Sequence, residues 1–135
     1  MPAVQGIGEM GEKIAADYLR KTGCKIIEKN YGGKFSSGLI GGEIDIIAKK
    51  NGVIHFVEVK SSAAKNPPAE DYFPPEARVN EAKEKRLIKT ALLWLTRHRM
   101  PLDSKWQIDI LSCVIDAETL KAKIRYFPNA IAARF

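Results

Sequence analysis

The strongest candidates for catalytic residues in this sequence of 135 residues are Asp45, Glu58 and Lys60. They lie in two segments, 43–49 and 53–60, in which Ile, Val, Phe and Ala are interspersed with polar residues, a pattern that predicts two β-strands. The Asn-Gly dipeptide between these segments predicts a two-residue hairpin turn. Such a turn sets the register so that Asp45 lies directly opposite Glu58, with Lys60 on the same face of the strand as Glu58.

Two carboxylates in this arrangement repel each other, because their β-carbons are only about 5 Å apart in a strand pair. A divalent cation relieves the repulsion, and Mg²⁺ or Mn²⁺ binds carboxylate oxygens while keeping several waters. The amine of Lys60 beside such a pair can orient a metal-bound water or help to deprotonate it. The pattern therefore predicts a hydrolytic site for phosphodiesters, with Asp45 and Glu58 as metal ligands. The alternative is a solvated hairpin face that mixes Glu and Lys.

Hydrophobic periodicity and turn residues predict two helices and five strands in the order α-β-β-β-α-β-β. We expect the helices at 7–21 and 76–99, and the strands at 25–30, 43–49, 53–60, 106–115 and 123–127. Segments rich in glycine or proline predict loops at 31–42 and 61–75, the second a mobile surface loop. The sequence thus predicts one α/β domain over residues 1–135, in which helices pack on a central mixed sheet.

The chain has a formal net charge of +6, which favours an anionic partner such as nucleic acid. Basic residues gather on the long predicted helix, where they can follow a phosphate backbone. The candidate nucleic-acid-binding residues are Arg78, Lys83, Arg86 and Lys89. The alternative is that this charged helix face is merely solvated.

No signal peptide and no apolar segment long enough to cross a membrane is evident in the sequence, so we expect a cytoplasmic protein without a membrane partner. Cys24 and Cys113 are far apart in the sequence, and we expect both to be reduced and buried. His55 has no partner at metal-ligand or triad spacing. The hairpin register places it opposite Ala48, near the solvent end of its strand.

The segments 42–48 and 56–60 closely resemble those of the YraN family, a widespread bacterial group with a restriction-endonuclease-like fold that is similar in outline to archaeal Holliday junction resolvases. The resemblance extends over nearly the whole chain, with matches at Gly11-Glu12, Asp109 and Asn129-Ala130. It implies a restriction-endonuclease-like α/β domain with a mixed central sheet flanked by helices.

The resemblance also implies a Mg²⁺- or Mn²⁺-dependent DNA endonuclease, with branched or structured DNA as a candidate substrate. In that case Asp45 and Glu58 hold the metal, Lys60 assists the water and Glu12 completes the site. Because the similar resolvases act as dimers, a homodimer is one option. Two alternatives stay open: a non-catalytic module that keeps the fold and binds nucleic acid or a partner, and a structural interaction protein whose sheet face another chain covers.

Overall fold

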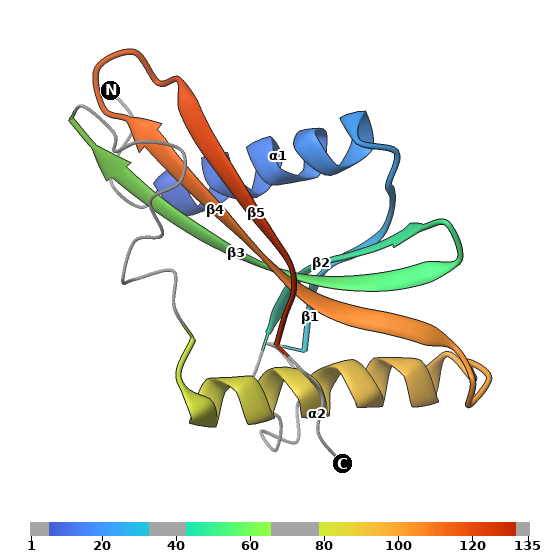
Figure 1. Cartoon of the computed structure of the whole chain (residues 1–135). Helices are drawn as coiled ribbons and strands as arrows, with labels where there is room; N and C mark the ends of the chain where they lie inside the picture. The colour runs from blue at the N-terminus through green and yellow to red at the C-terminus, as the bar shows by residue number, and fades with distance from the viewer. Residues whose placement is uncertain (1–5, 33–42, 66–78, 132–135) are drawn as a thin grey trace.

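The computed structural model describes residues 6–32, 43–65 and 79–131. Within these residues the elements follow the order α-β-β-β-α-β-β, as predicted (Figure 1). They are α1 (Gly6–Lys21), β1 (Lys25–Tyr31), β2 (Ile44–Lys50), β3 (Val53–Ala64), α2 (Glu81–Arg97), β4 (Lys105–Asp116) and β5 (Ala122–Ile131).

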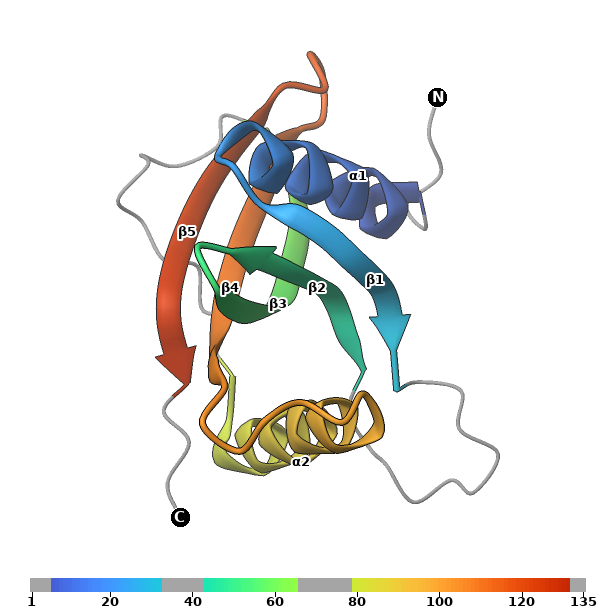
Figure 2. The same cartoon turned by 90° about the vertical axis from the view of Figure 1, so that its right-hand side faces the viewer.

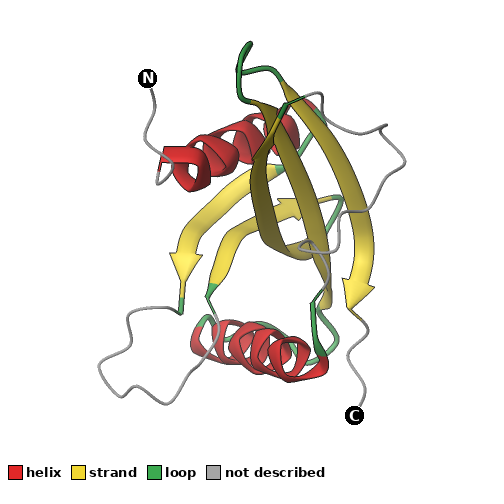
Figure 3. Cartoon of the chain, turned by 90° about the vertical axis from the view of Figure 1, so that its left-hand side faces the viewer, coloured by secondary structure: helices red, strands yellow, loops and turns green. Residues whose placement is uncertain are grey.

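The five strands form one sheet in the order β1-β2-β3-β4-β5. Strands β3 and β4 are parallel, and the other neighbours are antiparallel, so the sheet is mixed. The two helices lie on opposite sides of this sheet (Figure 2), and the same arrangement is seen from the other side in Figure 3. The restriction-endonuclease-like α/β fold class predicted from the sequence is confirmed.

Each helix packs its apolar stripe against one face of the sheet, and this gives two hydrophobic clusters. The α1 cluster joins buried helix and strand residues, among them Ala15, Ala16, Leu19, Ile46, Val57 and Leu111. The α2 cluster does the same on the other face, with Leu87, Ala91, Trp94, Ile47, Phe56 and Ile108. Because neighbouring strand residues point to opposite faces, β2 and β3 contribute alternately to both clusters and are anchored on both sides.

The hairpin of β2 and β3 has the predicted turn. Asn51 and Gly52 both have positive φ angles, 51° and 78°, as a primed two-residue turn requires. The paired register runs from Lys50 opposite Val53 to Ile46 opposite Val57, which confirms the predicted pairing over these positions.

The second helix begins later than predicted. Asn80 caps it, and the Asn80 side chain accepts a hydrogen bond of 2.8 Å from the backbone N–H of Lys83. A cap of this kind satisfies an N–H that the first helical turn leaves unpaired, so α2 starts at Glu81. Of the predicted start, residues 76–78 lie outside the described part of the chain, and the helix ends at Arg97 rather than at 99.

Two strands, β3 and β5, extend several residues beyond their predicted ends, because pairing with a neighbour lengthens them. The segment Ser61–Ala64 belongs to β3 and pairs with Cys113–Asp116 of β4, so the prediction of a loop from residue 61 is wrong. Strand β5 continues past Phe127 to Ile131, although it contains Pro128. A proline is tolerated there, because β5 is an edge strand and has a neighbour on one side only.

Some of the remaining predictions concern residues that the structure describes, and others concern residues outside the described ranges. Tyr31 belongs to β1, whereas positions 33–42 and 66–75 of the two predicted loops lie outside the described residues. Cys24 and Cys113 are both free and buried, as predicted. Neither of the two helices described is long and apolar enough to span a membrane.

Candidate active site

Asp45 and Glu58 lie at the end of the hairpin that is distant from the turn. Beyond the last paired residues, the Asp45 side chain turns across to β3 and its Oδ2 accepts a hydrogen bond of 2.7 Å from the backbone N–H of Val59. This bond ties the carboxylate to the neighbouring strand next to Glu58. The hairpin thus sets two acidic side chains beside each other on a framework that both helices anchor.

The surroundings of this pair disfavour two negative charges. Burial raises the pKa of Asp45 to about 8, and the Glu58 carboxylate adds to the rise, whereas the Val59 N–H opposes it. Glu58 is 5% exposed, and its Oε2 is buried with no hydrogen-bond donor among the residues described. An ionised Asp45 has no proton to donate to that oxygen, so the pair calls for a proton or a cation.

Lysines from two elements approach the other oxygen of Glu58. Lys60 Nζ lies 3.8 Å from Glu58 Oε1, and Lys83 Nζ of α2 lies 3.6 Å from the same oxygen. Burial lowers the pKa of Lys60, and the neighbouring Lys83 lowers it further, although Glu58 opposes the shift. Lys60 is therefore a lysine whose amine loses its proton more readily than an exposed one.

Glu12 reaches the site because α1 lies very close to β3. A β-carbon at Gly11 would stand 1.8 Å from Ser61 Oγ, so position 11 must be glycine for the two elements to approach this closely. With its amide oriented by the hydrogen-bond network, Asn30 donates to Glu12 Oε1 at 2.8 Å and to Glu43 Oε1 at 3.0 Å. Burial, and then the Glu43 charge, raise the pKa of Glu12.

These groups border one surface hollow of about 420 Å³. It is lined by Gly8, Glu12, Asn30, Glu43, Asp45, Val59, Lys60 and Ser61. Three of the four predicted catalytic residues therefore share one depression, and Glu58 lies next to it through its contacts with Asp45 and Lys60. Acidic, amide and amine groups converge there from α1, β1 and the hairpin.

The predicted nucleic-acid-binding residues do not share one environment. Lys83 is partly buried and faces Glu58, whereas Arg86 and Lys89 are exposed on α2. Arg78 lies outside the described residues. The helix spacing contains the signal for this division, because Lys83 stands four residues before buried Leu87 and so lies on the face that packs on the sheet.

The donor set of the site suits a hard divalent cation. Within the described ranges, no group of three or more His, Cys, Asp or Glu side chains is arranged to hold a metal ion. The site does hold two adjacent carboxylates, Asp45 and Glu58, and the buried Oε2 of Glu58 has no hydrogen-bond partner among the described residues. Mg²⁺ commonly binds proteins through one or two carboxylates and completes its shell with water and substrate oxygens, so the residues present fit this ion.

A second polar cluster was missed by the sequence reasoning. His55 is opposite Ala48, as predicted, but its side chain is only 14% exposed, so the expectation of a solvent-end position is wrong. Its Nδ1 lies 2.6 Å from Asp109 Oδ2, a contact that spacing along the sequence does not reveal. The fully buried Asp109 also accepts hydrogen bonds from Gln107 Nε2, the Asn129 backbone N–H and the Tyr126 hydroxyl. The reason is the parallel pairing of β3 with β4, which joins residues 54 apart in the sequence.

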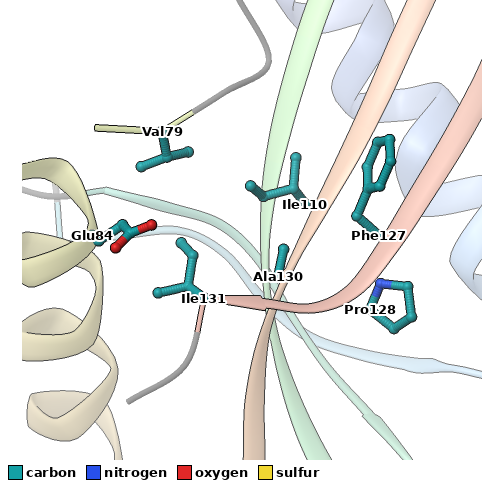
Figure 4. Close-up of a pocket in the computed structure, with 7 residues that line it drawn as sticks. All are labelled: Val79, Glu84, Ile110, Phe127, Pro128, Ala130 and Ile131. Atoms are coloured by element: carbon teal, nitrogen blue, oxygen red, sulfur yellow. The ribbon is translucent and has the colours of Figure 1, made fainter. Parts of the chain in front are cut away.

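A second hollow, of about 510 Å³, lies between the start of α2 and β5 (Figure 4). Its lining is mainly apolar, and Glu84 is the one charged residue among Val79, Glu84, Ile110, Phe127, Pro128, Ala130 and Ile131. This lining brings together no pair of acid, base or nucleophilic groups. Of these two hollows, only the one at the hairpin brings carboxylates and an amine together.

The fold and the site together define a restriction-endonuclease-like α/β domain with a carboxylate pair and a lysine on its central hairpin. A family model described as uncharacterised protein family UPF0102 matches residues 11–113. The chain belongs to this family, which confirms the resemblance to the YraN group.

Relatives of the chain cover most of its length. It is similar to a UPF0102 protein of Campylobacter fetus, with 42% identity over 77% of this chain and 80% of the relative. A UPF0102 protein of Coxiella burnetii is 35% identical over 97% of this chain and 96% of its own length. One from Trichlorobacter lovleyi is 33% identical over 93% and 90%, respectively.

Proposed function

We propose that this protein is a Mg²⁺- or Mn²⁺-dependent endonuclease that hydrolyses phosphodiester bonds in DNA. The observation that carries the proposal is the pair Asp45 and Glu58, in which a buried Glu58 oxygen has no donor among the described residues while a lysine lies next to the other oxygen. A buried carboxylate pair without a cation is unfavourable, so an arrangement that keeps it supports a metal-binding role.

In the proposed mechanism, Asp45 and Glu58 bind the ion, and the Val59 N–H fixes the orientation of Asp45. A bound divalent ion supplies a water of lowered pKa and neutralises charge on the phosphate. Lys60 would act at Nζ in one of two ways: the ammonium form would orient the attacking water through a hydrogen bond, and the neutral amine, which burial favours by lowering the pKa of Lys60, would accept a proton from that water. Glu12, held by Asn30, borders the same hollow and completes its acidic wall.

We assign binding of the nucleic acid to a basic surface on α2, formed by the exposed residues Arg86 and Lys89. The net charge of +6 favours a polyanion, and Arg86 and Lys89 are exposed on α2, the helix that also carries Lys83. Contacts of this kind position a phosphate backbone without reading its sequence. Branched DNA and action as a homodimer are further parts of the proposal, and they rest on the resemblance to Holliday junction resolvases.

The proposal is tested by incubating the intact protein with duplex, single-stranded and branched DNA in Mg²⁺ and in Mn²⁺. We expect cleavage that EDTA stops. Lys60→Ala is expected to abolish cleavage and to leave DNA binding nearly intact, because affinity comes mainly from backbone contacts elsewhere. Asp45→Asn and Glu58→Gln are expected to abolish cleavage through loss of the ion. Thermal melts of each variant show whether the fold is kept.

The non-catalytic alternative predicts a different result in the same assay. A module that only binds nucleic acid retains DNA in a gel shift and cleaves no substrate of the panel in either metal. That result, obtained with folded intact protein, contradicts the proposed activity. Cleavage that survives all three substitutions contradicts the assignment of Asp45, Glu58 and Lys60.

A further inference from the structure

Lys83 and Lys60 approach Glu58 from different elements. Both ammonium groups are within 4 Å of Oε1, at 3.6 Å for Lys83 and 3.8 Å for Lys60. The Glu58 side chain is 6% exposed, so its charge needs close neutralisation. Lys60 belongs to the same strand as Glu58, whereas Lys83 reaches it from the first turn of α2. The helix therefore contributes a side chain to a site otherwise built on α1, β1 and the hairpin.

Lys83 occupies a helix position that disfavours lysine. It is the third residue after the Asn80 cap, where Glu or Gln commonly completes a capping box. A cation there also opposes the helix dipole, whose positive end lies at the N-terminus. Local helix chemistry therefore does not account for Lys83, and its contact with Glu58 does. A residue that departs from local preference in this way is expected at a functional site.

We propose that Lys83 is a phosphate-binding residue of the site: Glu58 holds it until a divalent ion binds at Asp45 and Glu58, and the released ammonium group then contacts a DNA phosphate at the site. This inference rests on the proposed function. The ion carries twice the charge of an ammonium group and gains Asp45 as a second ligand, so it displaces a lysine from the shared carboxylate.

Exposure distinguishes the two lysines. The Lys83 side chain is 32% exposed and that of Lys60 is 22% exposed, so Lys83 is the one that solvent and a bound backbone reach more easily. Its flexible four-carbon stem allows the ammonium group to move once Glu58 is neutralised. Lys83 also lies on the helix whose exposed face carries Arg86 and Lys89, so the new contact joins the site to the basic surface.

The first test needs no DNA. The intact protein is labelled with an amine-reactive reagent, with and without Mg²⁺, and the rate at Lys83 is followed by mass spectrometry. Lys85 is the internal reference, because it is paired at 3.5 Å with exposed Glu81 on the outside of the same helix. We expect Mg²⁺ to raise the labelling rate of Lys83 severalfold and to leave that of Lys85 unchanged.

The second test measures affinity for a labelled four-way DNA junction over a range of salt, with and without Ca²⁺, which takes carboxylate oxygens as Mg²⁺ does. A gel confirms that the DNA stays intact. With Ca²⁺, Lys83→Gln is expected to make the slope of log affinity against log salt concentration shallower by about one, because one phosphate contact is lost. Without Ca²⁺ the same variant is expected to match the intact protein, and Lys85→Gln to match it in both conditions.

The outcomes separate this inference from the proposed function. If calorimetry shows that Mg²⁺ binds, but the labelling of Lys83 and the salt dependence of Lys83→Gln do not change, the release of Lys83 is contradicted and the metal site stands. If the intact protein binds no divalent ion, the proposed function fails and the inference fails with it. If the ion changes both the labelling rate of Lys83 and the salt dependence of the Lys83→Gln variant, the release of Lys83 from Glu58 is supported.

Discussion

Gly11 of α1 lies directly against Ser61 of β3: a β-carbon at position 11 would stand 1.8 Å from Ser61 Oγ and 2.7 Å from Ser61 Cβ. Such contacts are too short for real atoms, so any side chain at position 11 moves the helix or the strand. The next residue along the helix is Glu12, which borders the hollow at Asp45. The glycine therefore sets how close the Glu12 carboxylate comes to the hairpin.

Replacing Gly11 with alanine is expected to lower the free energy of unfolding by about 1–3 kcal/mol, the usual cost of overpacking. Gly8→Ala is the matched control, because a β-carbon at Gly8 in the same helix meets nothing within 4 Å. Since alanine favours a helix over glycine, Gly8→Ala is expected to keep or raise stability by up to about 1 kcal/mol. Urea unfolding measures both. Equal stability of the two variants contradicts the close approach of α1 and β3.

The raised pKa of Asp45 predicts how stability depends on pH in metal-free protein. The pKa rises from 3.8 to about 8 on folding, so between these values the folded protein binds more protons at Asp45 than the unfolded chain does. This contribution to stability is fully present below pH 3.8 and is lost as the pH rises through about 8. The free energy of unfolding should therefore fall with rising pH over this range.

Asp45→Asn isolates that contribution, because asparagine is similar in shape and does not titrate. The difference in free energy of unfolding between the variant and the intact protein, measured in EDTA, is expected to shift in favour of the variant as the pH rises. Saturating Mg²⁺ should reverse the trend for the intact protein, since the ion binds the ionised carboxylate. A difference that is constant with pH rules out a raised pKa for Asp45.

Asp109 is predicted to stabilise the sheet. Asp109→Ala leaves the Tyr126 hydroxyl, the Asn129 N–H and the His55 ring without their shared acceptor in a fully buried position. We expect a loss of about 3–5 kcal/mol in the free energy of unfolding. Asp103→Ala is the control: Asp103 is exposed in the segment before β4, and its loss is expected to change stability by less than about 0.5 kcal/mol. Similar losses in both variants contradict the role of the buried network.

The hairpin could be predicted from sequence because its determinants are local. The Asn-Gly turn and the apolar residues of the two segments are sufficient to set the register that brings Asp45 next to Glu58. Because these determinants lie close together in the sequence, the register can be predicted without knowing the order of the strands in the sheet. The same reasoning located Lys60, which lies two residues beyond Glu58 on the same strand.

What the sequence did not reveal depends on tertiary pairing. The extension of β3 through Ala64 and the contact of His55 with Asp109 both require the parallel alignment of β3 with β4, which follows a crossover through α2. Charge alone groups Lys83 with Arg86 and Lys89, whereas the packing of Leu87 against the sheet turns Lys83 toward Glu58. The close approach at Gly11 likewise appears only when α1 is docked on β3.

The central claim is that Asp45 and Glu58 form a divalent metal site, and titration calorimetry with Mn²⁺ near pH 8 tests it most directly. Intact protein is expected to bind the ion and to release protons, because the pKa of Asp45, raised to about 8, falls when the ion binds. Asp45→Asn, shown to be folded by its thermal melt, is expected to lose this binding. Equal Mn²⁺ binding by the two proteins, or no binding by the intact protein, contradicts the account.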